Sequence, residues 1–351
     1  MAPGFEVVTY EPKWLTQVLD LWALVQGQKM SREQFSWQFD RNPTGIVNIH
    51  LAISGGRVIG VVSHSAVRMN VAGREETVSV SINTDTHPDF RGRGVFSTLT
   101  RAAEDYAREA GAALMLGVPN EESKPIFLGR LGWHSLPGLR VLMRMLNPLT
   151  FATQYLGGRP VGGLGIGSRR TNAAHAPVVY GLGIPVTSEL SLEPIHRFES
   201  WADDLWSVAK PTMPHAVVRG ATYLNWRFAE KPDGRYVCFA VRAGSNIVGY
   251  IITGQTVKRN IIVSYVAHRL LHPAHAAEYS RIRTRALSAA NYGSVAALDL
   301  AFPEEPLRMR GGFLPTTKCL NLIYRPLRSD VTHDTIEAGQ WHLELGDLDF
   351  F

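Results

Sequence analysis

A short turn rich in glycine and arginine is the part of this sequence best suited to chemistry. It runs Thr86-His-Pro-Asp-Phe-Arg-Gly-Arg-Gly-Val-Phe-Ser97, between an expected strand and an expected helix that ends near Gly111. Glycine lets a ligand approach the main chain closely, and the first N–H groups of a helix have no partner within the helix. Because these N–H groups also form the positive end of the helix dipole, we expect the turn to hold a diphosphate.

The helix after the turn is indicated by its apolar period. Apolar residues recur at intervals of three and four, and charged residues such as Arg101, Glu104, Asp105 and Arg108 fill the other positions. The apolar positions are Val95, Leu99, Ala102, Ala103, Tyr106 and Ala110. This pattern predicts a helix with one buried face. Gly111 can end this helix.

The turn resembles the acyl-CoA-binding signature of the GNAT superfamily of N-acetyltransferases, which has Arg or Gln, two residues, Gly, one residue, then Gly or Ala. Here Arg91 and Gly94 fit that signature, whereas Phe96 replaces the small last residue. The resemblance implies acetyl-CoA as the cofactor, with CoA as a product. Carried over residue by residue, it assigns cofactor binding to Thr86, His87, Arg91, Gly92, Arg93, Gly94, Val95, Phe96, Ser97 and Asn120.

A second segment extends the resemblance to the other half of the cofactor cleft. The apolar run 112–118 has the length of a strand, and Asn120 follows it. A short expected helix then closes with Leu131-Gly-Trp133, which is similar to the family's Leu-Gly-Phe ending. Trp133 also suits a place in the core. The resemblance covers about residues 50 to 145.

The chemistry that the resemblance implies is direct acyl transfer from CoA to an amine in a ternary complex. A main-chain N–H near residues 85–87 would stabilise the oxyanion, and a base must take a proton from the amine. Asp85, at the end of the expected strand, is the first candidate base, followed by Glu122 and His134. These three residues are the expected catalytic residues.

Two of the expected site residues, Asp85 and His87, also have structural interpretations. Asp85 could cap the phosphate turn, and His87 could serve the shape of the turn. Many relatives carry a tyrosine that protonates the departing thiolate, at a position where this chain has Leu128. Water or another residue would then supply that proton.

Length and composition favour a soluble, intracellular enzyme of two domains. The chain has 351 residues, of which 45% are hydrophobic, and domains average about 150 residues. Cys238 and Cys319 give no disulfide framework, which suits a reducing cytoplasm, and both thiols are expected to be buried. No segment has the pattern of a signal peptide or a membrane span. We therefore expect a cytoplasmic protein without a membrane partner.

The positive charge of the chain is modest and dispersed. The net charge is +5, so nucleic-acid binding is permitted but not indicated. Arg281, Arg283 and Arg285 alternate along an expected helix, which scatters them around its surface, and we expect them to be solvated.

An internal repeat relates the two halves of the chain. Trp226 follows Trp37 by 189 residues, and the segments 35–45 and 224–234 align without gaps at this offset. The identical pairs are Trp37 and Trp226, Phe39 and Phe228, Pro43 and Pro232, Gly45 and Gly234, Gly55 and Gly244, and Gly60 and Gly249. The chain therefore resembles a tandem GNAT protein.

The second copy has lost the phosphate turn. It has His272-Pro-Ala-His-Ala-Ala-Glu278 where the turn should be, without glycine or a suitable arginine, so we expect it not to bind CoA. Its later strand, 294–303, and Arg310-Gly-Gly-Phe313 resemble the first copy more weakly. We expect this copy to wall the acceptor site or to stabilise the first. His268, His272 and His275 lack a carboxylate or cysteine that would complete a metal site.

The expected fold is α/β, with two GNAT-like domains, each a mixed, largely antiparallel twisted sheet flanked by helices. The boundaries are 1–150 for the catalytic domain, 151–185 for a glycine-rich linker, 186–330 for the degenerate domain and 331–351 for a tail. The linker contains a string of glycines without a surrounding βαβ unit. The tail suits either an edge strand or a terminus docked by Trp341, and by hypothesis Asp347 and Asp349 reach the acceptor.

The expected activity is acetylation of the primary amine of a small metabolite. One alternative is aminoacyl transfer from aminoacyl-tRNA, which known tandem GNAT-like proteins perform, usually without an intact phosphate turn. The other is a non-catalytic acyl-CoA sensor, which the absent tyrosine at Leu128 suggests. The chain could be a monomer or a homodimer, because the tandem arrangement can replace a dimer contact.

Overall fold

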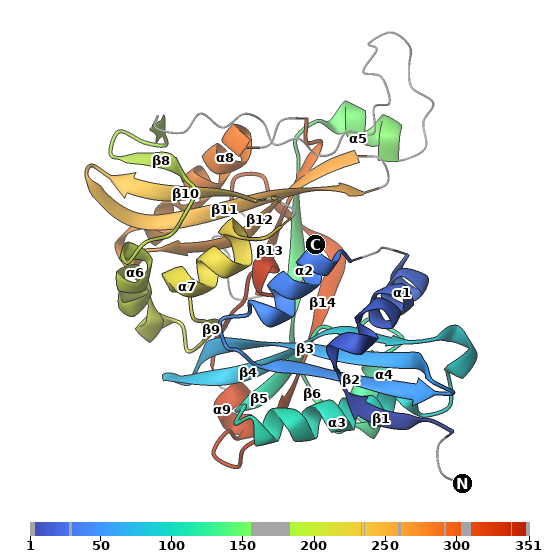
Figure 1. Ribbon diagram of the computed structural model, residues 1–351. Helices are drawn as coiled ribbons and strands as arrows, with labels where there is room; N and C mark the ends of the chain where they lie inside the picture. The colour runs from blue at the N-terminus through green and yellow to red at the C-terminus, as the bar shows by residue number, and fades with distance from the viewer. Residues whose placement is uncertain are drawn as a thin grey trace. The chain divides into compact units, whose positions relative to one another are not determined.

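Two compact units make up the described part of the chain. The computed structural model describes residues 4–27, 30–155, 183–232, 234, 236–258, 261–290, 293–302, 310–337 and 339–348. Unit 1 comprises Met1–Pro137, Met213–Val218 and Asn321–His342, and unit 2 comprises Gly138–Thr212, Arg219–Leu320 and Leu343–Phe351. Each unit has a mixed, mostly antiparallel sheet with helices on both faces (Figure 1). The predicted α/β fold class is confirmed.

Unit 1 is built on the strand order β1-β2-β3-β4-β5-β14, in which only β4 and β5 pair in parallel. Its strands are β1 (Glu6–Thr9), β2 (Val47–Ser54), β3 (Arg57–Val71), β4 (Arg74–Thr86), β5 (Leu114–Gly117), β9 (His215–Val217), β15 (Trp341–His342) and the last part of β14 (Leu314–Pro326). Its helices are η1 (Pro12–Trp14), α1 (Leu15–Gln26), α2 (Arg32–Phe35), η2 (Ser36–Asp40), η3 (Pro88–Phe90), α3 (Val95–Glu109), α4 (Lys124–Arg130) and α9 (His333–Glu337).

The alternation of side chains along β2 separates the two faces of this sheet. Ile49, Leu51 and Ile53 pack with α1, whereas Ala52 packs with α3, because successive residues of a strand point to opposite faces. α1 and α2 therefore cover one face of unit 1 and α3 covers the other (Figure 1). The predicted helix after the glycine turn is confirmed as α3, and Gly111 follows it with a φ of 78°.

Unit 2 repeats this plan with the strand order β6-β13-β12-β11-β10-β8-β7. Its strands are most of β6 (His134–Met145), β7 (Ile184–Pro185), β8 (Leu190–Ile195), β10 (Tyr236–Ala243), β11 (Asn246–Lys258), β12 (Ile261–Leu271), β13 (Ala296–Ala301) and the first part of β14. Its helices are α5 (Pro148–Tyr155), α6 (Trp201–Ala209), η4 (Lys210–Thr212), α7 (Ala221–Leu224), η5 (Asn225–Ala229), η6 (Pro273–Glu278), α8 (Tyr279–Ala290) and η8 (Leu345–Asp347). α8 packs on one face, and α6 and α7 lie on the other (Figure 1).

The repeat found in the sequence is kept by the elements of the structure. α2 and α7, the π-helices η2 and η5, and strands β2 and β10 all match at the offset of 189 residues, at both ends. A β-bulge follows Ala52 in one copy and Val241 in the other, at the same offset. Irregular features such as π-helices and bulges are rare, so their coincidence indicates one folding plan used twice.

The boundaries of the units differ from those expected at residues 150, 186 and 331. β5 takes its antiparallel neighbour from the end of β14, Ile323–Pro326, and β13 takes its own from β6, Arg140–Met145. Residues 138–150 therefore belong to unit 2, and residues 321–342 belong to unit 1. Most of the expected linker, residues 156–182, lies outside the described residues.

Two expectations about exposure are wrong. Arg283 is fully buried, donates to Asp299 at 2.6 Å and lies over the ring of Phe313, although its neighbours Arg281 and Arg285 are exposed. Alternate helix positions point in different directions, and spacing alone does not tell which one faces the sheet. Cys319 is exposed, whereas burial raises the pKa of the Cys238 thiol to about 12.

Candidate functional site

The glycine turn leaves a row of main-chain N–H groups open. Gly92 and Gly94 have φ values of 76° and 80°, which residues with a side chain rarely adopt. Gly94 is the N-cap of α3, and its carbonyl accepts the N–H of Thr98 at 3.0 Å. Among the described residues, the N–H groups of 92–97 donate to no main-chain oxygen. The turn therefore has the donors and the open space that an anion requires.

Arg91 and Arg93 place two exposed guanidinium groups beside these donors. Arg91 Nε donates to the Thr86 carbonyl at 3.4 Å, and the Arg93 guanidinium lies 5.1 Å from the ring centroid of Phe90. Neither contact occupies the whole guanidinium, so both side chains keep donors for a phosphate group.

His87 shapes the turn from inside. Its N–H donates to the Ile59 carbonyl at 2.8 Å, its Nδ1 accepts the N–H of Asp89 at 3.3 Å, and its Nε2 lies 2.9 Å from Arg57 Nη2. In the second copy, His272 makes the same two main-chain contacts without a glycine turn after it. The shared contacts favour the structural interpretation of His87.

Phe96 stands where the signature has a small residue, and its ring packs against neighbouring aromatic side chains. It lies edge to face with Phe127 at 5.2 Å, and Phe127 in turn contacts Trp133 at 4.8 Å. Trp133 is 3% exposed and Leu131 is 5% exposed, so the Leu-Gly-Trp ending belongs to the core between α3 and α4. The Phe96 ring therefore packs against this cluster.

β4 and β5 separate beyond the middle of β4. They pair only from Val78 to Val80, opposite Leu114 to Leu116, whereas β4 continues to Thr86. The edge of β4 next to the glycine turn therefore has no strand partner on the β5 side. This leaves main-chain groups near Thr86 available to a ligand.

Asp85 is held on the α1 face by Gln26, the last residue of α1. Gln26 Nε2 donates to Asp85 Oδ2 at 2.5 Å and lies 3.3 Å from Asn83 Oδ1. Burial raises the pKa of Asp85, and the Gln26 hydrogen bond and the charge of Arg91 oppose this rise. A carboxylate whose pKa is raised is better matched to proton transfer near neutral pH.

Asn120 and Glu122 share one turn, and His134 lies in different surroundings. Asn120 Oδ1 accepts the N–H groups of Glu122 and Ser123 at 3.1 and 2.8 Å, so Asn120 caps its own turn. Glu122 is exposed in this turn. His134 packs against His333, with 3.9 Å between ring centroids, and burial followed by the charge of His333 lowers its pKa.

Gln26 and Arg57 were not predicted, and they contact Asp85 and His87. Gln26 is 59 residues from Asp85, and Arg57 is 30 residues from His87. Neither has a local motif, so the only signal in the sequence was the pairing of β3 with β4, which brings Arg57 near His87.

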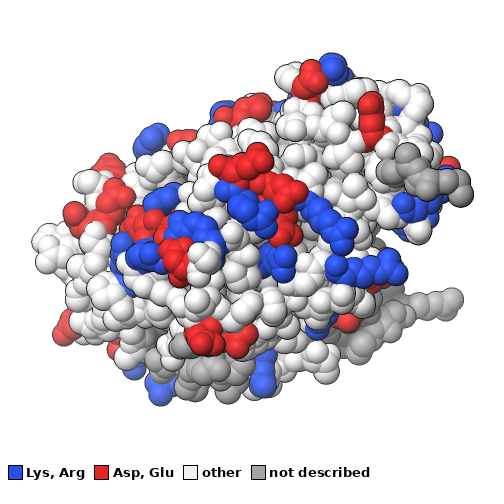
Figure 2. Space-filling model, turned by 90° about the horizontal axis from the view of Figure 1, so that it is seen from below, with Lys and Arg blue, Asp and Glu red and all other residues white. Residues whose placement is uncertain are grey.

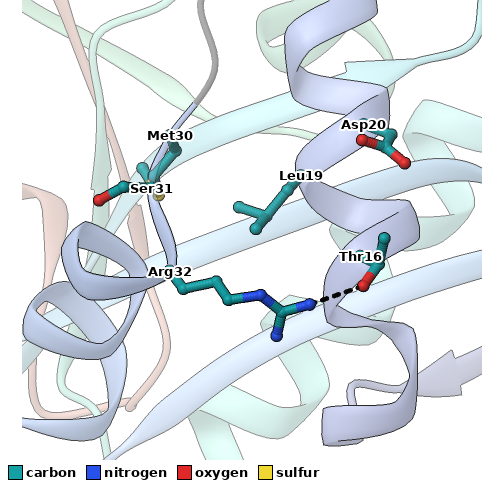
Figure 3. Close-up of a pocket in the computed structure, with 6 residues that line it drawn as sticks. All are labelled: Thr16, Leu19, Asp20, Met30, Ser31 and Arg32. Atoms are coloured by element: carbon teal, nitrogen blue, oxygen red, sulfur yellow. Dashed lines mark hydrogen bonds between the residues drawn. The ribbon is translucent and has the colours of Figure 1, made fainter.

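Two pockets of unit 1 do not include the turn. One of about 350 Å³ lies between α1 and α2, where Leu19 and Arg32 point into the space and Arg32 Nη2 donates to Thr16 Oγ1 at 2.9 Å (Figure 3). The other, of about 400 Å³, lies beside the C-terminal half of α3 and is lined by charged side chains. Neither is lined by a residue of 85–97.

The equivalent place in unit 2 has no glycine turn. η6 leads directly into α8 without a glycine. His268 is buried, and its Nε2 lies 3.2 Å from Asp347 Oδ1, so the hypothesis that Asp347 reaches an acceptor amine is wrong. Asp349 lies outside the described residues. Within the described residues, no three His, Cys, Asp or Glu side chains are grouped as metal ligands.

On the face shown in Figure 2, neither acidic nor basic side chains dominate. Acidic and basic side chains lie side by side on the face seen from below (Figure 2). Among the described helices, none combines the length and the apolar character needed to cross a membrane.

Comparisons with known proteins find similarity to acetyltransferases. Residues 6–136 match the family model described as an acetyltransferase (GNAT) domain, whereas no curated protein sequence matches the chain. This match contains the turn, β4, β5 and α4. It ends one residue before the boundary of the first segment of unit 1.

Solved structures share the fold of the whole chain. A GCN5-related N-acetyltransferase from Anabaena variabilis has 10% identity and a TM-score of 0.64, covering 92% of this chain and 73% of that one. One from Kribbella flavida has 14% identity and a TM-score of 0.57, covering 92% and 71%. Saccharomyces cerevisiae N-myristoyltransferase with bound myristoyl-CoA has 13% identity and a TM-score of 0.63, covering 100% and 87%. Residues 6–136 are therefore similar to a GNAT acetyltransferase domain, and the chain shares its fold with these N-acetyltransferases and with the N-myristoyltransferase.

Proposed function

We propose that unit 1 transfers the acetyl group of acetyl-CoA to the primary amine of a small metabolite, with CoA as the product. The observation that carries this proposal is the row of open N–H groups at 92–97, which includes the left-handed glycines Gly92 and Gly94. These donors and the exposed Arg91 and Arg93 fit the diphosphate of CoA. An intact turn also argues against an aminoacyl-tRNA donor.

The N–H of Thr86 is the donor that we assign to the oxyanion. The His87 N–H donates to Ile59 on β3, so its strand neighbour Thr86 presents its own N–H to the opposite edge. That edge is the one left open where β4 and β5 separate. A fixed N–H aimed at developing negative charge stabilises acyl transfer without rearranging in the reaction.

Asp85 is the base that we assign to the amine. It lies in the part of β4 that has no β5 partner, and its side chain lies on the α1 face beside Gln26. The pocket between α1 and α2 lies on this same face and provides room for part of an acceptor (Figure 3). Leu128 cannot act as an acid, so water would protonate the leaving thiolate. The thiol of CoA has a pKa near that of a free thiol, about 8.5, so its thiolate is a tolerable leaving group.

A pair of glycine variants tests the cofactor site. Gly94 and Gly45 both have left-handed φ values, 80° and 67°, and both have open space where a Cβ would lie. Gly94→Ala and Gly45→Ala should therefore cost similar backbone strain, about 1 kcal/mol. Only Gly94→Ala should weaken acetyl-CoA binding in calorimetry, by about tenfold or more, because it alters the main-chain donors.

Two further measurements separate this activity from the alternatives. Acetyl-CoA, and not tRNA, should raise the melting temperature of the full chain, because only a ligand of the folded state stabilises it. Release of free thiol with a library of amines would then identify the acceptor. Absence of any heat with acetyl-CoA would refute the proposal, and binding without thiol release would favour an acyl-CoA sensor.

A further inference from the structure

A charged pocket in unit 1 has no role in the function proposed above. It has a volume of about 400 Å³ and lies between the C-terminal half of α3, the end of α4 and the last part of β14. Three arginines line it, Arg101 from α3, Arg130 from α4 and Arg325 from β14, together with Glu104 and Asp105. Its chemistry therefore depends on how these charges are paired.

Both carboxylates of the pocket are already engaged. Glu104 is 6% exposed, and its Oε1 accepts Arg108 Nη2 and Arg325 Nε, each at 3.0 Å. Asp105 Oδ1 accepts Arg108 Nη1 at 2.9 Å. These contacts balance the two acids against Arg108 and Arg325.

Arg101 and Arg130 remain without a partner. Both are exposed, and neither makes a hydrogen bond or an ion pair with any described residue. They reach the pocket from two different helices, so two full positive charges converge on one hollow. Such a site has an excess of charge-assisted donors and suits an anion.

Arg325 forms the floor of the pocket in a fixed orientation. Its Nη1 donates to the Gly132 carbonyl at 2.7 Å, while its Nε is held by Glu104. Gly132 has a φ of 67°, and a Cβ at this position would lie 2.9 Å from Arg325 Nη1. A side chain at position 132 would therefore crowd this guanidinium.

We propose that this pocket binds a phosphate group between Arg101 and Arg130. A phosphate offers several oxygens to two guanidinium forks at once, whereas a chloride offers one point of contact. The phosphate could be a free phosphate compound or the 3′-phosphate of CoA. Arg101 follows Gly94 by seven residues of α3, a rise of about 10 Å, so a group attached to CoA could span the distance. This second source rests on the proposed function.

Binding of inorganic phosphate to the full chain tests the site without reference to CoA. The variant R101Q/R130Q removes both unpaired charges, and K13Q/R41Q removes two exposed charges that do not line the pocket. In a phosphate-free buffer, calorimetry should show affinity at least about tenfold weaker for R101Q/R130Q and unchanged for K13Q/R41Q. Asp105→Asn should strengthen binding by about twofold, because it removes a negative charge from the rim.

Comparison of CoA with 3′-dephospho-CoA distinguishes the two sources. If the site holds the 3′-phosphate, wild type should prefer CoA by about tenfold or more, and R101Q/R130Q should lose this preference. Equal affinities for both compounds, with inorganic phosphate still bound, identify a separate phosphate ligand. If CoA does not bind but phosphate does, the proposed function fails and this site stands. Equal phosphate affinity in wild type and R101Q/R130Q, or no binding of phosphate or CoA, would overturn the proposal.

Discussion

Gln26 and Asp85 are joined by a hydrogen bond of 2.5 Å between the end of α1 and the end of β4. Gly27 closes α1 immediately afterwards with a φ of 71°, so the position of Gln26 is fixed by the helix end. The bond favours the charged form of Asp85, while burial favours the neutral form and raises its pKa. Burial therefore dominates the acidity of the proposed base, and Gln26, a residue outside the turn, opposes its effect.

Replacement of Gln26 by Leu should raise the pKa of Asp85 further, because it removes a hydrogen bond to the carboxylate. The acidic limb of the kcat/KM profile, measured by thiol release, should move to higher pH. Asp85→Asn should lower kcat/KM by about 10²-fold and abolish that limb. If the limb stays in place in both variants, Asp85 is not the base.

Phe96→Ala should reduce stability and leave cofactor binding almost unchanged. The Phe96 ring packs on Phe127, so its loss should cost about 2 kcal/mol of unfolding free energy, less than for a fully buried phenylalanine. Urea unfolding measures this cost, and calorimetry with acetyl-CoA measures binding. The opposite pattern, intact stability with weakened binding, would place Phe96 in the cofactor site.

The sequence was sufficient for features whose signals are local. The turn around Gly94, helix α3 and the repeat through Trp37 and Trp226 all rest on short segments, and each appears in the structure. Gln26 could not be found in this way, because only the packing of α1 on β4 brings it to Asp85. The buried Arg283 was missed because a helix period gives relative directions and not the direction of the core.

Sequence patterns also could not predict that β5 pairs with β14 and that β13 pairs with β6. β5 and β13 are short apolar strands, and many segments of similar character could pair with either one. Their partners β14 and β6 come from the other half of the chain in sequence. Such pairings depend on total burial and not on a local motif.

The segment 343–348 supplies a contact in unit 2 that α1 supplies in unit 1. In unit 1, Phe39 stacks with Trp22 of α1 at 6.3 Å. The matching Phe228 of unit 2 is approached by Gly346, and Arg227 Nε donates to the Gly346 carbonyl at 2.7 Å. α6 ends at Ala209, so the residue that matches Trp22 lies outside it. The tail therefore has a structural role in this copy.

Gly346→Ala should destabilise the protein by about 1 to 3 kcal/mol through overpacking. A Cβ at Gly346 would meet the Phe228 ring and, at 2.9 Å, the Ala267 carbonyl, which is main chain and cannot move away easily. Gly129→Ala in α4 is a matched control, because its Cβ would meet open space and alanine favours a helix. Urea unfolding should separate the two variants, and equal stability would show that the tail is not packed there.

The buried histidines of unit 1 should make the protein sensitive to acid. His64 is 1% exposed, its Nδ1 lies 3.1 Å from Ser79 Oγ, and burial followed by the charge of His50 lowers its pKa to about 3. In the unfolded chain the pKa of a histidine is about 6.5, so the unfolded state binds this proton first as the pH falls. Stability from neutral His64 is therefore full above pH 6.5 and is lost progressively between about pH 6.5 and 3.

His64→Gln keeps a hydrogen-bonding group near Ser79 and removes this titration. The unfolding free energy of the variant, measured by urea at a series of pH values, should fall less steeply below pH 6.5 than that of wild type. His50 and His268, whose pKa values burial also lowers, should retain part of the slope. His196→Gln changes an exposed side chain and should keep the full slope. An equal slope in His64→Gln and wild type would mean that His64 is hydrated in solution, because only a buried imidazole resists protonation in the folded state.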